Sequence, residues 1–572
     1  MRVNKKSTSQ GIMKGMSLTG AFLLFLIPLC SWNCKKEEEK PKDNTEKNPI
    51  QLVSVKWGDV QVYGIRKGAD VDQTLRIRFS NKLDTQIAKE SIRIKYNGVI
   101  SVDGTYFFEN KDSTLVFTPA EPLKYYSKYT IPITESVKSF QGQSLESGQT
   151  VLLRTTYNPI PKFNEISMDL LLDSVQLKTF DFFWDHAHPV SRLARERLGS
   201  NDIVTSGGTG FGIMAGIAAV DRGFIGHGEY VQHLNTMTDF LWNKADVFHG
   251  AFSHWLNGTT GKVRPFSAND NGGDLVETSF LIMGLLSAKE YFDGTNEEEV
   301  LLRNTIDSIW HRVDWNWYTK NGQENQLYWH WSPDKGWAMN MPIRGWNECL
   351  ITHVLAASSP THPVSDQVYH NGWARNGGLK NGKSFYGFNL PLGEDLGGPL
   401  FFSHYSFLGI DPRNLSDDYA DYWEQNQNHS RINHAYCRAN PKNQAGYSDS
   451  MWGLTASDNP WGYSAHSPTN DKGVITPTAA LSAFPYTPEE STKALKFFYY
   501  TMGDLLWKKY GFVDAFCPGE VWTASSFLAI DQGPIVVMIE NYRTQLLWKL
   551  FTSNTDVING MKTLNFKAPY LN

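Results

Sequence analysis

The hydrophobic pattern of this chain changes near residue 160. From about residue 51 to residue 156, apolar and polar residues alternate in short runs, as in strands that bury one face. Beyond residue 161, apolar residues recur every three or four positions, which is the spacing of one helical face. We therefore expect a small β domain followed by a larger, mainly α domain.

The alternating pattern predicts a small β-sandwich over residues 50–157. Its strands are expected at residues 75–79, 92–96, 115–118 and 129–133. Turn residues at 81–84 and the pair Asn97-Gly98 separate these runs. Because no group of residues in this part is suited to chemistry, we expect the sandwich to be a spacer.

A linker at 157–161 precedes a predicted helical domain over residues 162–572. Helices are expected at residues 170–187, 212–219, 230–242, 275–291, 297–313, 347–357, 417–436, 478–484, 489–507 and 534–550. Many helices joined by long, polar, glycine-containing loops predict an α/α toroid. Such a toroid pairs inner with outer helices, and the loops at one end form a cleft.

The N-terminus has the features of a processing segment. Basic residues precede an apolar run at 16–29 that is too short for a stable membrane span. Cys30 and Cys34 follow, and Cys34 is the better candidate for a lipid because it stands directly before a charged run. This arrangement resembles the lipoprotein signals of Bacteroidetes. The resemblance implies a signal peptide over residues 1–34, a lipid on Cys34 and a charged tether over residues 35–49.

These features predict an outer-membrane lipoprotein that is exposed on the cell surface and held to the membrane by its lipid. A periplasmic location is one alternative. A plain secreted protein with a poor cleavage site is the other.

Composition narrows the function classes. The 19 Trp, 25 Tyr and 32 Phe residues suit a carbohydrate protein, because aromatic faces stack on sugar rings, although a large core also uses many aromatics. A net charge of −5 without a basic patch excludes nucleic acid as a partner. Cys349, Cys437 and Cys517 lack disulfide or metal spacing, so we expect packed thiols. His and acidic residues occur in the loops without the spacing of metal ligands, so we expect no metal and no cofactor, and a hydrolytic metal site is the alternative.

The residues most suggestive of chemistry lie between positions 269 and 290. A polar loop with Asp270 leads into an apolar helix that starts with Asp274 and Glu277, three residues apart and hence on one face. His254 and Trp255 lie shortly before this loop in the sequence. The alternative is structural, since a helix N-terminus favours acids and Asp274 can be an N-cap.

Other helix starts carry similar groups. Glu348 follows Trp346, and Asp531 opens the last predicted helix. The loop 447–463 carries aromatic side chains, namely Tyr447, Trp452 and Trp461. Each could be a cap or a core residue, but their recurrence at helix starts predicts one shared cleft. Glycosidic cleavage needs a proton donor and a second carboxylate, and Glu277 and Glu348 fit that need. The sequence lacks a Gly-x-Ser-x-Gly elbow, a P-loop and a His-Glu-x-x-His motif.

Five further segments carry a resemblance to a known family. They are residues 210–216, 345–348, 447–457, 511–514 and 531–542. With the acidic loop, they resemble the bacterial glucoamylase-like proteins, and within them the β-1,2-glucanases of glycoside hydrolase family 144, over residues 165–550. Residues 76–84 and 115–119 are similar to the bacterial Ig-like domain of the SbsA type.

The resemblance implies an (α/α)6 toroid that cleaves β-1,2-linked glucose polymers by a metal-free, inverting single displacement. The family's acidic residues fall on Asp270, Asp274, Glu277, Glu348 and Asp531. Glu348 is the candidate general acid, Glu277 an alternative acid or base, and Asp270 and Asp274 would orient water or substrate. The candidate sugar-binding residues are His254, Trp255, Trp346, Trp452, Trp461 and Tyr447.

We expect endo action that releases sophoro-oligosaccharides, by a monomer whose partner is the glucan. An exo-acting enzyme of the same family that releases sophorose is an alternative. A non-catalytic surface glycan-binding lipoprotein is another, because a tether, a spacer and an aromatic cleft also suit a binder.

Overall fold

The computed structural model of the chain describes residues 48–572. The predicted signal peptide, the predicted lipidation site at Cys34 and nearly all of the predicted tether lie outside the described residues. Among the helices that are described, none has both the length and the apolar character to cross a membrane.

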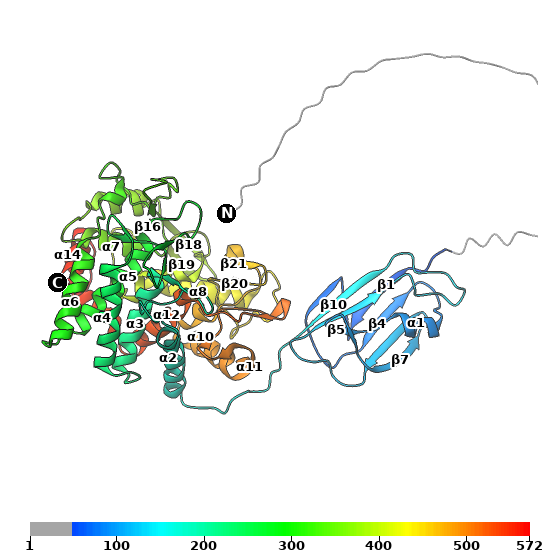
Figure 1. Cartoon of the computed structure of the whole chain (residues 1–572). Coiled ribbons are helices and arrows are strands. Elements are labelled where there is room, and N and C mark those ends of the chain that lie inside the picture. Colours follow the sequence, from blue (N-terminus) through cyan, green and yellow to red (C-terminus); the bar gives the residue numbers. More distant parts are fainter. Residues whose placement is uncertain (1–47) are drawn as a thin grey trace, which may run out of the picture. The chain divides into compact units, whose positions relative to one another are not determined.

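The first described domain is a β-sandwich (Figure 1, blue to cyan). Its two five-stranded sheets have the orders β2-β1-β4-β8-β7 and β3-β10-β9-β5-β6. One apolar cluster, with Trp57 and Ile77 from the first sheet and Ile131 and Leu153 from the second, fills the space between them. The elements are β1 (Leu52–Trp57), β2 (Val60–Gln61), β3 (Ile65–Ala69), β4 (Leu75–Phe79), α1 (Thr85–Ser91), β5 (Lys95–Tyr96), β6 (Ile100–Ser101), β7 (Gly104–Glu109), β8 (Thr114–Pro119), β9 (Lys128–Ile133) and β10 (Gln149–Thr155).

Three of the four predicted strands are confirmed as β4, β8 and β9. The prediction for residues 92–96 is wrong at its start, because Ile92 is the C-cap of α1 and only Lys95–Tyr96 is a strand. The carboxylate of Asp84 accepts hydrogen bonds from the amides of Gln86 and Ile87. The polar residues 81–84 therefore lead into a helix, since Asp84 is its N-cap.

The second domain is mainly α (Figure 1, green to red). Its helices are α2 (Met168–Asp185), α3 (Ser206–Asp221), α4 (His227–Asn243), α5 (Leu275–Tyr291), α6 (Glu297–His311), α7 (Leu350–Ser358), α8 (Tyr422–Ala439), α9 (Pro477–Leu481), α10 (Pro488–Lys496), α11 (Gly503–Leu506), α12 (Ala529–Arg543), α13 (Leu546–Ser553) and α14 (Thr555–Thr563). Every predicted helix overlaps an observed one. Their ends differ most where a turn divides a predicted helix.

Two predicted helices are broken. The helix expected at 534–550 is α12 and α13, because Gln545 adopts a left-handed backbone conformation (φ 66°) between them. The helix expected at 489–507 is α10 and α11, separated by a π-helical turn at Phe497–Thr501. The apolar spacing continues across both breaks, so the sequence pattern hid them.

The loops of the helical domain contain short strands in sheets of two or three, which the sequence pattern did not predict. They are β11 (Ile203–Thr205), β12 (Val247–Phe248), β13 (Ala251–Phe252), β14 (Trp255–Asn257), β15 (Val263–Arg264), β16 (Gly273–Asp274), β17 (His330–Trp331), β18 (Lys380–Phe385), β19 (Phe388–Leu392), β20 (Ala456–Asn459), β21 (Gly462–Ala465), β22 (Trp507–Lys508), β23 (Gly511–Phe512), β24 (Phe516–Cys517) and β25 (Trp522–Thr523). Most have only two or three residues, too few for a detectable alternation.

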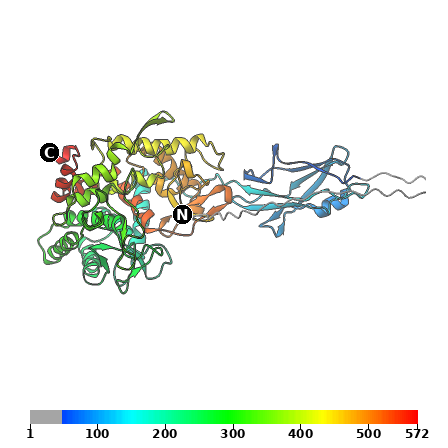
Figure 2. The same cartoon turned by 90° about the horizontal axis from the view of Figure 1, so that it is seen from above.

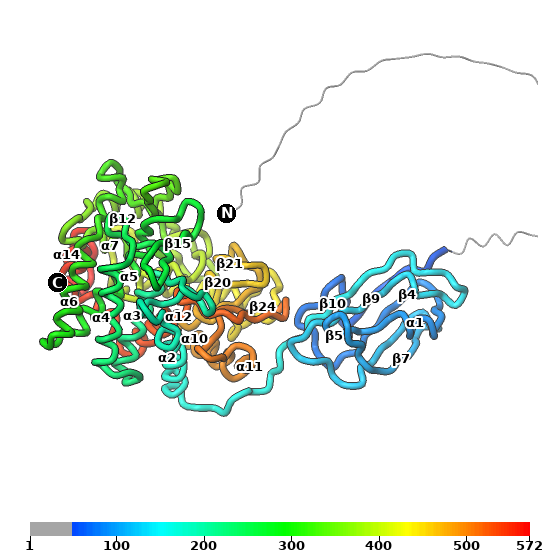
Figure 3. Tube along the Cα trace, viewed as in Figure 1, coloured from blue at the N-terminus to red at the C-terminus, as the bar shows by residue number. Residues whose placement is uncertain are grey.

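Helix α3 lies at the centre of this domain. It packs against α2, α5 and α12, so α3 and α12 are neighbours in space although 300 residues separate them in the chain (Figure 3). The C-terminal helix α14 packs on α7 (Figure 2, red beside green). Where α3 crosses α5, a Cβ on Gly210 would lie 2.0 Å from the carbonyl oxygen of Phe280. The glycines of α3 therefore permit a close helix crossing.

Candidate active site

A pocket of about 410 Å³ opens in the helical domain. It brings together Glu277 and Glu348, whose positions differ by 71 in the sequence, with His254 and Trp255 beside them. The further lining residues are Glu196, Arg197, Thr205, Phe266, Phe280, Trp329, Phe401, Tyr405, Ala456, Tyr463, Ala465, Leu528 and Ile530. Aromatic walls with a few convergent charged groups are typical of a small-ligand site.

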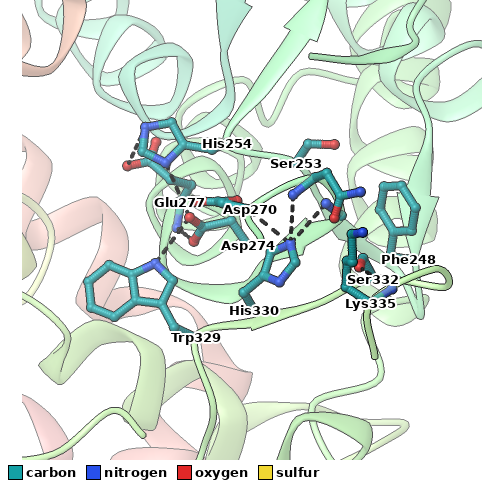
Figure 4. Close-up of polar contacts among 12 residues, drawn as sticks. Phe248, Ser253, His254, Asp270, Asp274, Glu277, Trp329, His330, Ser332 and Lys335 are labelled. Carbon is teal, nitrogen blue, oxygen red and sulfur yellow. Dashed lines mark hydrogen bonds and ion pairs between the residues drawn. The ribbon is translucent and has the colours of Figure 1, made fainter. Parts of the chain in front are cut away.

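Four side chains at the start of α5 form what we call the histidine cluster: His254, Asp270, Asp274 and Glu277 (Figure 4). Asp274 is the N-cap of α5, and its Oδ1 accepts from the amides of Val276 (3.0 Å) and Glu277 (2.9 Å). The capping role predicted as the structural alternative is thus present. It coexists with contacts that capping does not require.

The second oxygen of Asp274 contacts two residues that line the pocket. Asp274 Oδ2 is 3.2 Å from His254 Nδ1 and accepts a hydrogen bond of 3.0 Å from the indole N–H of Trp329. His254 Nε2 lies 3.8 Å from Glu277 Oε1. Burial lowers the pKa of His254, but the nearby Glu277 and Asp274 carboxylates outweigh burial and raise this pKa to about 9. His254 is therefore an imidazolium at neutral pH that compensates the buried carboxylates.

Glu277 is held from the side of α3. Its Oε2 accepts from the amide of Gly207 at 3.0 Å and lies 3.4 Å from the hydroxyl of Thr205. A Cβ on Gly207 would come within 2.3 Å of the same oxygen, so this position requires glycine. Burial raises the pKa of Glu277, whereas His254 lowers it.

Asp270 completes the cluster from the loop before α5. Its Oδ1 lies 3.7 Å from His330 Nε2, but that nitrogen already accepts from the amides of Asn271 and Gly272. His330 is therefore neutral and supplies no ion pair. Burial and the neighbouring Asp274 raise the pKa of Asp270 to about 7.

His254, Asp270 and Asp274 are close enough to be compared with a metal site, because their potential ligand atoms lie within 4.8 Å of one another. The donor set does not fit a metal. Asp274 already accepts hydrogen bonds at both oxygens, and His254 carries a proton where a metal would bind. The cluster is better described as an ion-pair network.

Glu348 approaches the pocket from a different element. It lies in the turn directly before α7, whereas the sequence predicted it inside the first helical turn. Its carbonyl oxygen accepts from the Ser406 hydroxyl, which fixes the backbone. Among the described residues, no other side chain donates a hydrogen bond to its carboxyl group. Burial, followed by the Glu277 and Asp274 charges, raises the pKa of Glu348 to about 7.

A second group of acids, which we call the aspartate cluster, consists of Asp458, Asp514 and Asp531. Arg197 bonds both oxygens of Asp458, at 3.0 and 3.2 Å, and also pairs with Glu196. The Tyr405 hydroxyl donates to Asp531 Oδ1 at 3.3 Å. Because Arg197 and Tyr405 line the pocket, they connect this cluster to it.

The predicted sugar platforms separate into two groups. Trp452 is fully buried and donates its indole N–H to the Glu490 carbonyl; Trp346 packs against Trp373, and Tyr447 donates to Asp471. The prediction for Trp452 is corrected, because its ring is fully buried and presents no face to a ligand. Trp346 and Tyr447 belong to the same core cluster and are each 7% exposed, and their contact with sugar stays a prediction. Trp255 lines the pocket, and Trp461 is 62% exposed at the tip of the β20–β21 hairpin.

Several pocket residues were not predicted. Tyr463 ends the loop 447–463 that the sequence singles out, and Trp329 lies between the predicted helices at 297–313 and 347–357. Only the structure places both beside the acids. Asp514 ends the motif at 511–514, and Glu196-Arg197 has no local signal at all. The predicted packed thiols are confirmed, since Cys349, Cys437 and Cys517 are free and buried.

Two family models match the sequence. Residues 340–555 match the model described as "Putative glucoamylase", and residues 65–156 match a bacterial Ig-like domain. The exo β-1,2-glucooligosaccharide sophorohydrolase (non-reducing end) of Parabacteroides distasonis is 47% identical over 415 residues, which are 69% of this chain and 57% of that protein. The chain thus spans only 57% of the length of that relative.

Two solved structures are similar along their whole length. The endo-β-1,2-glucanase of Chitinophaga pinensis, in complex with sophorotriose and glucose, is 51% identical with a TM-score of 0.69, covering 71% of this chain and 100% of that one. A "putative glucoamylase" of Bacteroides uniformis is 52% identical with a TM-score of 0.70, covering 72% and 100%. The chain therefore belongs to the bacterial glucoamylase-like family that includes these proteins, glycoside hydrolase family 144.

Proposed function

We propose that the protein hydrolyses β-1,2-glucan, with endo action and inversion, and releases sophoro-oligosaccharides. The observation that carries this proposal is an aromatic pocket that holds Glu348 and Glu277 and that Asp531 adjoins through Tyr405. Both similar β-1,2-glucan enzymes, from Chitinophaga pinensis and Parabacteroides distasonis, support the choice of substrate.

Glu348 acts as the general acid. A carboxyl group with a pKa of about 7 still carries its proton in a large share of molecules at neutral pH, and an acid with a pKa near the working pH transfers it efficiently. The proton passes to the glycosidic oxygen as the bond from that oxygen to C1 breaks. Since no other described side chain donates to this carboxyl, its oxygens are free to meet the substrate.

A water molecule then attacks C1 from the opposite face and gives its proton to a carboxylate. Asp531, whose pKa is raised by burial to about 7, is our candidate for this base and connects to the pocket through Tyr405. Glu277 accepts from the Gly207 amide and lies beside the positively charged His254, which fixes its position, so we assign it, with Asp270 and Asp274, to orienting substrate or water. Glu277 remains the alternative base.

The decisive experiment incubates the purified protein with linear β-1,2-glucan and follows the products by chromatography. A ladder of sophoro-oligosaccharides establishes endo action. Sophorose alone from the earliest time points to the exo activity of the Parabacteroides distasonis relative. Binding of the glucan without any product identifies a glycan-binding lipoprotein, and cleavage of another glucan overturns the substrate assignment.

The helical domain is proposed to be an (α/α)6 toroid. Helices α3, α5 and α12 are buried along almost their whole length, as inner helices would be, whereas α4 and α6 bury one face each and pack on each other. A crystal structure with a bound sophoro-oligosaccharide tests the ring of inner helices and the position of the cleft together.

The location at the outer membrane, through a lipid on Cys34, is likewise a proposal that rests on the sequence. Metabolic labelling with a radioactive fatty acid should mark the wild type and Cys30→Ser but not Cys34→Ser. Protease digestion of whole cells then separates a surface location from a periplasmic one. Labelling of Cys34→Ser and loss of labelling in Cys30→Ser would move the lipid to Cys30.

A further inference from the structure

Asp514 is a buried acid to which the proposed reaction assigns no role. It lies just after β23, it is 3% exposed, and its amide donates to the Ser526 carbonyl at 3.0 Å. Asp531, in the first turn of α12, is 2% exposed. Each carboxyl group shifts the pKa of the other, so the two lie side by side in the interior. Two buried carboxyls in contact need an explanation, because both cannot be ionised at low cost.

The hydrogen bonds of the pair leave one proton unaccounted for. Asp514 Oδ2 accepts from the amide of Asp458 at 2.7 Å, and Asp531 Oδ1 accepts from the Tyr405 hydroxyl at 3.3 Å. The remaining oxygens, Asp514 Oδ1 and Asp531 Oδ2, are buried and meet no donor group among the described residues. A proton on one carboxyl, donated to the other, satisfies both atoms at once.

The surroundings decide which carboxyl carries the proton. Burial raises the pKa of Asp514 well above its usual range, and the nearby Asp531 and Asp458 add to this rise. Burial also raises the pKa of Asp531, to about 7, although the positive charge of Arg197 opposes that rise. The other groups that face the pair are Tyr405 and Tyr463, both with pKa values raised well above 10 and hence neutral. Arg197 is the cation that faces the pair, and Glu196 and Asp458 already engage it.

We propose that Asp514 is a positioning residue: it keeps its proton and donates a hydrogen bond to Asp531, which holds Asp531 in place as the ionisable base. This inference rests on the proposed function. It makes the two aspartates a unit that titrates together, as carboxyl pairs in other hydrolases do.

The test compares Asp514→Asn and Asp514→Ala in the full chain. The amide of Asn donates to Asp531 Oδ2 in place of the proton and accepts from the Asp458 amide, so D514N should keep kcat within about tenfold of wild type. D514A leaves Asp531 Oδ2 unpaired, which raises the pKa of Asp531. The acid limb of the kcat/KM profile on β-1,2-glucan should then move to higher pH. A limb that moves up by about one pH unit lowers kcat/KM at pH 6 about tenfold, and KM should change less.

A second measurement does not depend on activity. Folded Asp514 keeps a proton that an unfolded aspartate loses near pH 4, so wild-type stability should fall as pH rises from about 4 to about 7. D514N lacks this titration, so its melting temperature should depend less on pH in that range. If D514A does not fold, the comparison of D514N with wild type still tests whether Asp514 keeps its proton.

Three results would overturn the proposal. One is an unshifted acid limb with wild-type kcat in D514A, and another is equal loss of activity in D514N and D514A. The third is an equal slope of melting temperature with pH in D514N and wild type. An inactive wild type overturns the proposed function and the role of Asp514 in the reaction, whereas a flatter slope in D514N would still establish the shared proton.

Discussion

The histidine cluster lines the pocket through His254 and Glu277, and the aspartate cluster contacts the pocket residues Arg197 and Tyr405, but the two clusters compensate their buried carboxyl groups differently. In the histidine cluster, His254 supplies a positive charge, and the start of α5 and Gly207 supply amide donors. In the aspartate cluster, Arg197 is engaged by Glu196 and Asp458, so Asp514 and Asp531 meet with a proton between them.

The difference has a functional consequence. A carboxylate that contacts a cation and amide donors is held in one position, which suits the orientation of a substrate. A carboxylate beside a protonated partner titrates near neutral pH, which suits proton transfer. Carboxyl groups near one pocket thus serve either substrate orientation or proton transfer, because their neighbouring groups differ.

The largest effect should come from Glu348, which belongs to neither cluster. Glu348→Gln removes the transferable proton and keeps the shape, so kcat should fall about 10³-fold, or about 4 kcal/mol, with little change in melting temperature. Steady-state kinetics on sophoro-oligosaccharides measure it. Glu394→Gln, at an exposed glutamate outside the pocket, is the matched control. Wild-type turnover in Glu348→Gln would refute the general-acid role.

The next variants break the comparison directly. Asp531→Asn should lower kcat about 10²-fold to 10³-fold with little change in KM, because it removes the base. Glu277→Gln should raise KM as well, because it breaks the pairing with His254 that orients the substrate. If Glu277→Gln instead lowers kcat alone while Asp531→Asn changes mainly KM, the base belongs to the histidine cluster.

A backbone position tests how tightly the histidine cluster is held. Gly207→Ala places a Cβ about 2.3 Å from Glu277 Oε2, so the carboxylate must move. A displacement of about 1 Å at a catalytic site can cost about 100-fold, and we expect kcat/KM to fall by up to that factor. Gly228→Ala, where a Cβ meets nothing within 4 Å, should leave kcat/KM unchanged. Equal activity of the two variants would show that Glu277 tolerates movement.

The smallest effect is a difference in pH dependence. The folded pKa of His254 is about 9 and its ordinary value is 6.5, so its stabilisation is complete below about pH 6.5 and is lost as pH rises through 9. His254→Gln should therefore flatten the stability curve between pH 6.5 and 9, by about 1–3 kcal/mol at most. Calorimetry at several pH values measures it. In D514N the stability should instead become less dependent on pH between pH 4 and 7. If both variants changed in the same pH range, the two clusters would not differ in how they compensate their buried carboxyl groups.

The sequence predicted much of this fold from short-range pattern. The alternation at residues 75–79 and the helical spacing at 275–291 match β4 and α5 residue for residue, because one buried face imposes each period. The break at Gln545 was missed, since a single left-handed residue leaves the apolar spacing intact. The pairs of two-residue strands around the cleft were missed because they carry no period.

The sequence by itself determined the acids Asp270, Asp274 and Glu277 as one group, because a helix start places them within one turn, and it marked Glu348 and Asp531 through their motifs. Only the tertiary structure placed Glu348 in one pocket with Glu277 and Asp514 beside Asp531. It also buried Trp346 and Trp452 in the core. The physical reason is that spacing along a helix fixes which neighbours share a face. Burial, and with it the charge state of each carboxyl, depends on segments hundreds of residues away.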